Sequence, residues 1–230
     1  MKIDLSKYLK DRYHETSLSH AFPGPVVTIS RESGCPAKKL AVLLVEKLNS
    51  ANLKFTKDLP WRWISKEIME ESAKELDVDL SEIKYVFDYK THGILEDFML
   101  SHSKKLFKPD MKIRNTIAKV IRSFADEGNA IIVGRGGVAI TRDIPKSLHI
   151  QLEAPLEWRA VRTSEKQNLA IEDARKYCLD IDRKREQFRD YFQGKGNDYT
   201  RVDLNFNCMT LTLDEIAEII ISSMKIRKII

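Results

Sequence analysis

Residues 26–39 have the sequence VVTISRESGCPAKK, and this stretch decides the fold. Its first five residues are mostly β-branched and predict a strand. Apolar residues then recur at helical spacing from Leu40 to Leu48, which predicts a helix over about residues 38–49. A strand that leads through a short turn into a helix presents free N–H groups and the positive end of the helix dipole to an anion. We therefore predict a phosphate-binding turn at residues 31–39.

The turn departs from the phosphate-binding P-loop motif, G-x-x-x-x-G-K-[ST]. That motif has glycine where this chain has Arg31 and Pro36. It has lysine and then serine or threonine where this chain has Ala37 and Lys38. Lys38 lies one position late, but it could still bring a point charge to the β- and γ-phosphates. The alternative is an ordinary strand–turn–helix connection with a solvated pair, Lys38 and Lys39.

Strands and helices alternate along the rest of the chain. Apolar runs of strand length predict further strands at residues 130–133, 148–152 and 202–206. Apolar residues at helical spacing predict helices at residues 111–127, at residues 170–192 and from Thr212 onward. Such alternation is typical of an α/β fold built on a parallel sheet.

We expect one main domain over residues 23–230, preceded by an N-terminal helical extension over residues 1–22. Residues 60–108 have apolar residues at helical spacing, little glycine and no convincing strand. A helical insertion is therefore expected over about residues 60–110. A short second strand is expected before it, at residues 54–56.

Composition limits the classes of protein that the chain can represent. Its 230 residues are 43% apolar, which suffices for a full core, and 39 basic against 34 acidic residues give a net charge of +5. Acidic residues interrupt the basic stretch 175–189, so we do not expect nucleic-acid binding. Neither a signal peptide nor a run of ~18 apolar residues is present, so we expect no membrane partner. Cys35, Cys178 and Cys208 lie far apart without C-x-x-C spacing, which predicts a cytoplasmic protein without disulfides.

Three motifs resemble those of the cytidylate kinase-like family, a branch of the P-loop nucleoside monophosphate kinases. Residues 28–34 match the family pattern I-T-I-S-R-E-x-G near its start, and residues 131–136 match a buried strand followed by Gly-Arg. The third motif begins with Ala-Pro-Leu-Glu-x-Arg, matched by residues 154–159, and continues with a later Asp-x-x-Arg, matched by residues 182–185. The order and spacing of these motifs agree across about residues 26–225.

This resemblance implies both a fold and a function. The implied fold is a P-loop NTPase-like three-layer α/β structure, with a parallel sheet between helices on both faces and a lid at about residues 159–195. The implied function is ATP-dependent phosphoryl transfer to a nucleotide or another small phosphorylated acceptor, with ATP and Mg²⁺ as cofactors. An acidic residue usually follows the Gly-Arg motif in cytidylate kinases; Gly136 takes its place here, so cytosine recognition is not supported.

The candidate site residues are cations and small residues that could surround a phosphoryl group. The candidate catalytic residues are Lys38, Arg159, Arg162 and Arg185. The candidate nucleotide- or phosphate-binding residues are Arg31, Ser33, Gly34, Lys38, Lys39, Arg114, Arg135 and Asp182. For each of the helical residues, the alternative is an ordinary salt bridge on a solvated face. The metal ligands are unknown, although Ser30, Glu32 and Ser33 are oxygen donors in or beside the turn.

Two alternatives remain open. Trp61 and Trp63 either stack on a base or, as we favour, pack the insertion onto the core. The altered turn also allows a catalytically degenerate protein that binds a nucleotide or another anion without turnover. The sequence leaves the acceptor and the oligomeric state undetermined.

Overall fold

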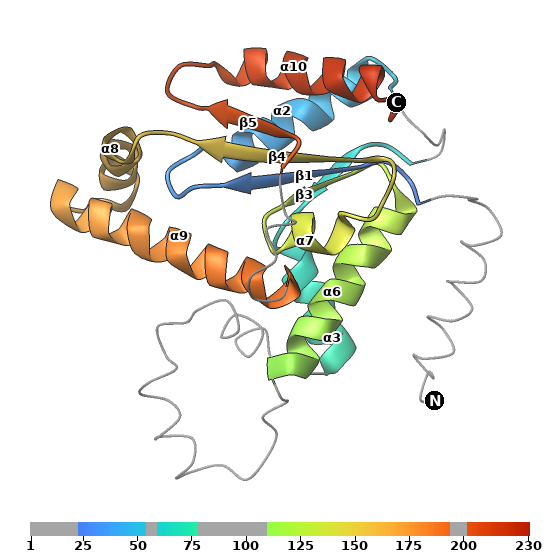
Figure 1. Ribbon diagram of the computed structural model, residues 1–230, viewed down its shortest axis with the longest axis horizontal. Helices are drawn as coiled ribbons and strands as arrows, with labels where there is room; N and C mark the ends of the chain where they lie inside the picture. The colour runs from blue at the N-terminus through green and yellow to red at the C-terminus, as the bar shows by residue number, and fades with distance from the viewer. Residues whose placement is uncertain (1–22, 54–58, 78–109, 194–201) are drawn as a thin grey trace, which may run out of the picture.

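A computed structural model describes residues 23–53, 59–77, 110–193 and 202–230 (Figure 1). Its centre is a five-stranded sheet in the order β2-β3-β1-β4-β5, in which all neighbouring strands are parallel. The strands are β1 (Val26–Arg31), β2 (Arg62–Ile64), β3 (Ala130–Val133), β4 (Ser147–Glu153) and β5 (Leu204–Asn207). The expected α/β fold with a parallel sheet is therefore confirmed.

Helices cover both faces of this sheet and form the outer two of three layers. The helices on one face are α2 (Ala37–Ser50) and α10 (Leu213–Ile226) (Figure 1). The helices on the other face are α3 (Glu67–Leu76), α6 (Asp110–Glu127), α7 (Gly137–Thr141) and α9 (Ile171–Gln193). Helix α8 (Leu156–Gln167) packs on α9 near the end of the sheet where the arrowheads of β1 and β4 lie. The carboxyl ends of these strands therefore face the α8–α9 pair.

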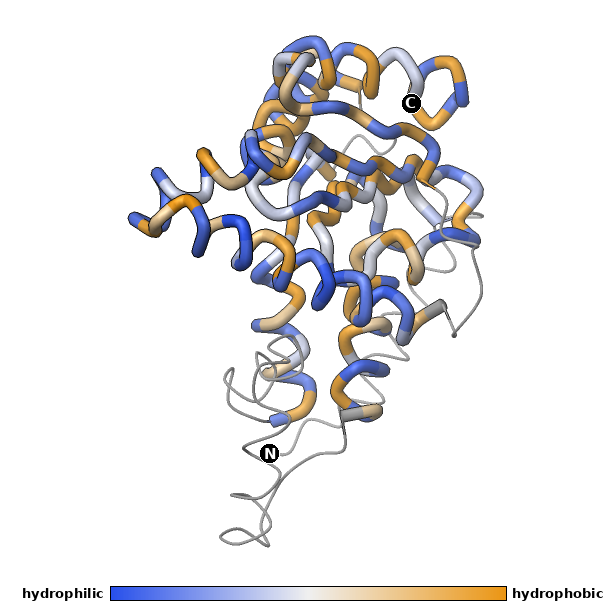
Figure 2. Tube along the Cα trace, turned by 60° about the vertical axis from the view of Figure 1, so that its left-hand side comes forward, coloured by the Kyte–Doolittle hydropathy of each residue, from blue (hydrophilic) through white to orange (hydrophobic). Residues whose placement is uncertain are grey.

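The continuous apolar runs of the strands arise because both faces of the sheet are buried. Val27 and Ile29 of β1 pack with α2 and α10, whereas Val26 packs into a second cluster with α3 and α6. Apolar residues gather along the central strands and alternate with hydrophilic residues along the surrounding helices (Figure 2). This arrangement fixes the strand ends, and with them the turns that carry the candidate site.

Most of the predicted elements are present within two or three residues of the expected bounds. The predicted start of the last helix is confirmed, because Thr212 and Glu215 form a complete capping box at the N-terminus of α10. The predicted helix at residues 1–22 and the strand at residues 54–56 lie outside the described residues.

Residues 78–109 of the expected helical insertion lie outside the described residues, and at the start of this region the structure differs from the sequence prediction. Residues 62–64 form the edge strand β2, which pairs with β3, and only then does helix α3 begin. A three-residue strand is too short to produce a recognisable period of two, which is why the sequence did not show it. Helix α7, a five-residue helix directly after the Gly-Arg motif, was also not predicted.

Trp61 confirms the core-packing interpretation for one of the two tryptophans. Its side chain is 1% exposed, and its indole N–H donates to the backbone oxygen of Leu53 at 2.5 Å. Asn49 holds the backbone of Trp61 through two hydrogen bonds, of 2.9 and 3.0 Å. Trp63 is only half-buried and lines a surface hollow together with Lys38 and Lys39.

Candidate phosphate-binding site

The turn after β3 brings its backbone directly against a side chain from β1. Gly134, Arg135 and Gly136 all have left-handed backbone conformations, with φ of 73°, 59° and 73°. Glycine adopts this conformation without strain, whereas arginine does so at a cost. A Cβ atom at Gly134 would lie 1.8 Å from Nη1 of Arg31, so the guanidinium of Arg31 occupies the space that a side chain there would need. Gly134 therefore makes room for Arg31 at the end of β3.

Arg31 is the centre of a group of three arginines, which we call the cationic cluster: Arg31, Arg135 and Arg185. Arg185, on α9, donates from Nη1 to the backbone oxygen of Arg31 at 3.0 Å. Burial, followed by the charges of Arg185 and Arg135, lowers the pKa of Arg31 to about 9. Burial also lowers the pKa of Arg185. The guanidinium groups of Arg135, on the β3 turn, and Arg185, on α9, thus lie close enough to Arg31 to disfavour its charge, which favours a bound anion.

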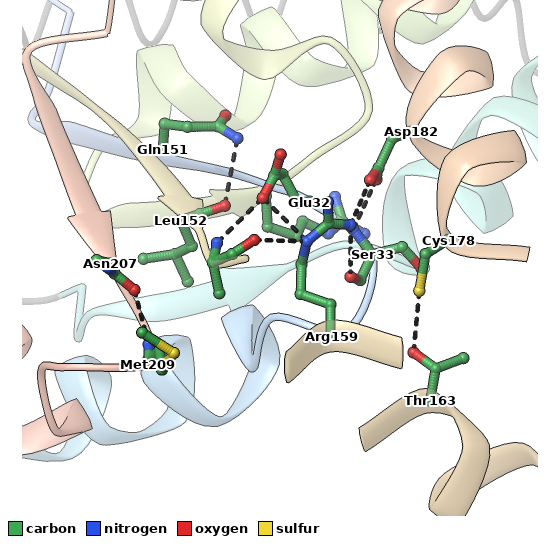
Figure 3. Close-up of polar contacts among 12 residues, drawn as sticks. Glu32, Ser33, Gln151, Leu152, Arg159, Thr163, Cys178, Asp182, Asn207 and Met209 are labelled. Atoms are coloured by element: carbon green, nitrogen blue, oxygen red, sulfur yellow. Dashed lines mark hydrogen bonds and ion pairs between the residues drawn. The ribbon is translucent and has the colours of Figure 1, made fainter. Parts of the chain in front are cut away.

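Arg159 has a different environment, because its guanidinium is already bound by the protein (Figure 3). The side chain is 6% exposed, and Nε donates to the Ala154 backbone oxygen at 2.8 Å and lies 3.1 Å from the Glu32 carboxylate. Nη1 donates to Asp182 at 2.7 Å and to the Ser33 backbone oxygen at 3.3 Å. Arg159 therefore ties the turn after β1 to both α8 and α9. Its predicted role in neutralising a transferred phosphoryl group remains a prediction.

Asp182 places a carboxylate where the sequence predicted a phosphate. Its Oδ1 accepts a hydrogen bond of 2.6 Å from the Ser33 N–H, inside the predicted phosphate-binding turn, and lies 3.5 Å from Nη1 of Arg185. Gly34 follows with φ of 93°, and a Cβ there would lie 2.9 Å from the backbone oxygen of Arg159. The turn is therefore packed closely on α8, with the carboxylate of Asp182 on one of its amides.

Lys38 and Lys39 lie at a surface hollow beside Trp63. Both are exposed in the first turn of α2, where they line a hollow of about 360 Å³ with Trp63 and neighbouring residues of α2. The charges that act on Arg31 are those of Arg185, Arg135 and Asp182. The structure brings Arg31, Ser33, Gly34, Arg135, Arg159, Asp182 and Arg185 together, and the predicted role of Lys38 remains a prediction.

Arg114 and Arg162 stack on aromatic rings. The guanidinium of Arg114, on α6, lies 4.4 Å from the ring centroid of Tyr191 and 5.5 Å from that of Phe188, both on α9. Arg162 lies 4.5 Å from the ring centroid of Trp158 on its own helix. Arg114 is 3% exposed, so in this structure it joins α6 to α9. The predicted nucleotide-binding role of Arg114 and catalytic role of Arg162 remain predictions.

A metal site is not preformed in the described part of the chain. No group of three or more His, Cys, Asp or Glu side chains there is arranged to hold an ion. The two carboxylates beside the turn, Glu32 and Asp182, are both bound by Arg159. His149 is buried among hydroxyl groups, with Nδ1 2.8 Å from Thr28 Oγ1 and Nε2 3.1 Å from Ser147 Oγ. These residues do not fit a protein-built magnesium site.

Two residues shape the site in ways that the sequence did not predict: Glu32, considered only as an oxygen donor for a metal, and Gly134, which was given no role. Glu32 also accepts a hydrogen bond of 3.0 Å from the Ala154 N–H, so its carboxylate joins the turn to the end of β4. Gly134 makes room for Arg31. The Ser-Arg-Glu and Gly-Arg motifs contain both residues, but a motif does not state which distant segment each one meets.

The parallel five-stranded sheet, its two helical layers and the cationic cluster at its carboxyl end define the class: a P-loop kinase-like α/β protein. The model of the cytidylate kinase-like family matches residues 26–209. The chain therefore belongs to the cytidylate kinase-like family, as the sequence motifs indicated.

The chain aligns with solved structures of other proteins. An uncharacterized protein from Eubacterium ventriosum ATCC 27560 aligns with a TM-score of 0.60 at 19% identity, over 87% of this chain and 98% of that one. Shikimate kinase from Bacteroides thetaiotaomicron aligns over the same shares of the two chains, with a TM-score of 0.48 at 9% identity. No curated protein matches the chain. Among the described residues, no helix combines the length and apolar character needed to cross a membrane.

Proposed function

We propose that the protein is an ATP-dependent phosphotransferase that acts on a nucleotide or another small phosphorylated acceptor. The observation that carries this proposal is the cationic cluster at the carboxyl end of the sheet. Phosphoryl transfer needs little covalent help from a protein; it needs positioned positive charge around the moving group. Membership of the cytidylate kinase-like family supports this class of reaction.

The charge balance around Arg31 favours an anionic ligand. Of the groups that act on its charge in the described part of the chain, two are arginines and one, Asp182, is a carboxylate. A phosphate would satisfy the guanidinium groups through charge-assisted, bidentate hydrogen bonds and so offset the repulsion that Arg185 and Arg135 exert on Arg31. Arg135 would hold the acceptor phosphate, and Arg185 would stabilise charge on the transferred group.

To bind at the turn after β1, a phosphate would have to replace the carboxylate of Asp182. Asp182 accepts the Ser33 N–H and pairs with Arg159, so a phosphate that uses this amide must displace a carboxylate. Asp182 lies on α9 and Arg159 on α8, the two helices of the predicted lid. Opening of this helix pair would release the amide, and closure would exclude water from the phosphoryl group. Because Glu32 and Asp182 are occupied by Arg159, we assign no step to a protein-bound magnesium ion.

The test measures ATP consumption by the full chain with each nucleoside monophosphate, in the presence of magnesium. We expect turnover with at least one acceptor, its loss in Arg135→Gln and its retention in Arg183→Gln. Arg183 is a suitable control because its side chain on α9 is 69% exposed and pairs with Asp180. Failure to consume ATP with every nucleotide acceptor would remove the nucleotide-kinase form of the proposal.

The second candidate is a protein that binds a nucleotide without turnover. It is favoured by Asp182, whose carboxylate occupies the Ser33 amide that a nucleotide phosphate would use, and by the absence of the P-loop lysine at Ala37. Calorimetric titration separates the two candidates, since a binding protein gives heat with ATP analogues while ATP itself stays intact. In both candidates we place the protein in the cytoplasm, with a small phosphorylated ligand and no nucleic acid as its partner.

A further inference from the structure

The guanidinium of Arg159 is shared between two carboxylates from different segments of the chain (Figure 3). Glu32, the first residue after β1, lies 3.1 Å from Nε of Arg159. Asp182, on α9, lies 2.7 Å from Nη1. The Arg159 side chain is 6% exposed, and a cation buried to this degree is strongly destabilising unless a carboxylate offsets its charge. The two carboxylates therefore decide whether Arg159 can remain in this place.

Each carboxylate also accepts a backbone N–H, but only one of these N–H groups belongs to the proposed anion site. The Ser33 N–H, which we assign to a phosphate, donates to Asp182 at 2.6 Å. The Ala154 N–H, directly after β4, donates to Glu32 at 3.0 Å. A phosphate at the Ser33 amide would therefore displace Asp182 and leave the contacts of Glu32 intact.

Glu32 lowers the free energy needed to displace Asp182 in two ways. It competes with Asp182 for the same guanidinium, which weakens the hold of Arg159 on Asp182. It also remains beside Arg159 after Asp182 has left, so the buried charge keeps one carboxylate. Ala154 supports this second role, because its backbone oxygen accepts from Nε of Arg159 at 2.8 Å while its N–H holds Glu32.

We propose that Glu32 is a positioning residue that acts through Arg159 and keeps Asp182 displaceable from the Ser33 amide. Glu32 itself touches no ligand; it holds Arg159 against the end of β4 while Asp182 moves away. This inference rests on the proposed function, because it assumes that an anion binds at the Ser33 amide. It assigns to Glu32 a role in ligand binding that is separate from the stability of the turn.

The first measurement is isothermal titration of the full chain with pyrophosphate. Glu32→Gln keeps an oxygen that can accept the Ala154 N–H, but it removes the charge that competes for Arg159. Asp182 should then hold Arg159 more firmly, so the affinity for pyrophosphate should fall about tenfold. A purely electrostatic effect has the opposite sign, because the loss of a negative charge beside the turn would raise the affinity for an anion.

The second measurement needs neither a ligand nor enzyme activity. Glu32→Gln and Asp182→Asn each leave Arg159 with one carboxylate, whereas the double variant leaves its buried charge with none among the described residues. The fall in melting temperature of the double variant should therefore exceed the sum of the falls for the two single variants. Such a result shows that the two carboxylates depend on one another through Arg159.

Glu127 provides a matched control within the same chain. It pairs with Arg62 at the opposite end of the sheet, where β2 and β3 begin. Its side chain is 27% exposed, close to the 32% of Glu32. Glu127→Gln should leave the affinity for pyrophosphate unchanged, and its effect on the melting temperature should add to that of Asp182→Asn.

Two outcomes would overturn the role of Glu32: an unchanged or increased affinity for pyrophosphate in Glu32→Gln, or additive falls in melting temperature for Glu32→Gln and Asp182→Asn. The titration uses a single variant, so it decides the proposal even if the double variant does not fold. A wild type that does not bind pyrophosphate would contradict both this proposal and the anion site. A wild type that binds pyrophosphate but consumes no ATP would contradict only the phosphotransferase, so the two failures are separate results.

Discussion

Arg31 stands where the P-loop motif has glycine, and it adds a guanidinium that such a loop lacks. Its charge is disfavoured by burial and by Arg185 and Arg135, so the folded protein holds Arg31 at an electrostatic cost. A residue that is held at a cost, beside other cations and at the carboxyl end of a parallel sheet, is more readily explained by ligand binding than by stability.

The first prediction concerns the replacement Arg31→Gln. It removes one charged hydrogen-bond donor, so the affinity for pyrophosphate should fall about 10- to 100-fold. Stability should not fall by a comparable amount, because the repulsion from Arg135 and Arg185 disappears with the charge. Isothermal titration and urea denaturation measure the two effects. Equal affinity in the wild type and the variant would exclude Arg31 from the anion site.

The second prediction concerns Asp182→Asn, which keeps a hydrogen-bond acceptor but removes the competing negative charge. Pyrophosphate affinity should rise, since the ligand no longer displaces an anion from Ser33 and Arg159. Stability should fall by about 1–3 kcal/mol, because Arg159 loses one charged partner and keeps only Glu32. Isothermal titration checks the expected rise in affinity, and urea denaturation checks the expected fall in stability. A loss of affinity would instead place Asp182 among the groups that hold the ligand.

At the scale of elements, the turn at residues 134–136 positions the cationic cluster. Its left-handed conformation carries Arg135 between two glycines, and Gly134 leaves room for the guanidinium of Arg31. The turn therefore positions two of the three arginines of the cationic cluster, Arg31 and Arg135. A change in the backbone of this turn should therefore alter anion binding at the site more than it alters the packing of the core.

The third prediction compares Gly134→Ala with Gly134→Asn. Both variants introduce a Cβ atom 1.8 Å from Nη1 of Arg31, so both should displace that side chain and weaken pyrophosphate binding. Asparagine tolerates a positive φ better than alanine, so Gly134→Ala should lose about 1 kcal/mol more stability. Isothermal titration measures the change in pyrophosphate binding, and urea denaturation measures the change in stability. Unchanged binding in both variants would contradict the close packing of Arg31 on this turn.

The sequence predicted the elements of this fold better than it predicted the site. Long apolar runs and strong periods located β3, α6 and α9, because burial on a sheet face or a helix face leaves a pattern along the chain. The edge strand β2 has only three residues and leaves no such pattern. Pairing of Arg159 with Glu32 and Asp182 joins three distant segments, and no local pattern encodes it.

At the scale of the whole molecule, stability should depend on the protonation of His149. Its ring lies between Thr28 of β1 and Ser147 of its own strand, and burial lowers its pKa below the usual value of 6.5. Asp203 acts in the opposite direction and Arg227 in the same direction, both more weakly than burial. His149 is therefore neutral in the folded protein at pH 7.

The fourth prediction follows from the sign of this shift. The unfolded chain takes up the proton more readily, so the contribution of His149 to stability is complete above about pH 6.5 and is lost as the pH falls. The loss can reach about 1.4 kcal/mol per pH unit. Melting temperatures of the wild type and His149→Gln between pH 8 and pH 5 provide the measurement. The variant should melt lower at pH 8 but show a flatter profile, and parallel profiles would contradict the prediction.

Among the described residues, the two outer strands of the sheet are short: β2 has three residues and β5 has four. An outer strand carries backbone donors and acceptors that another polypeptide can pair with, and a short one provides few of them. Pairing of two copies of the chain through β2 or through β5 would thus form few backbone hydrogen bonds. Any self-association of this protein should proceed through its helical surfaces, and amyloid-like stacking of the folded form should be slow.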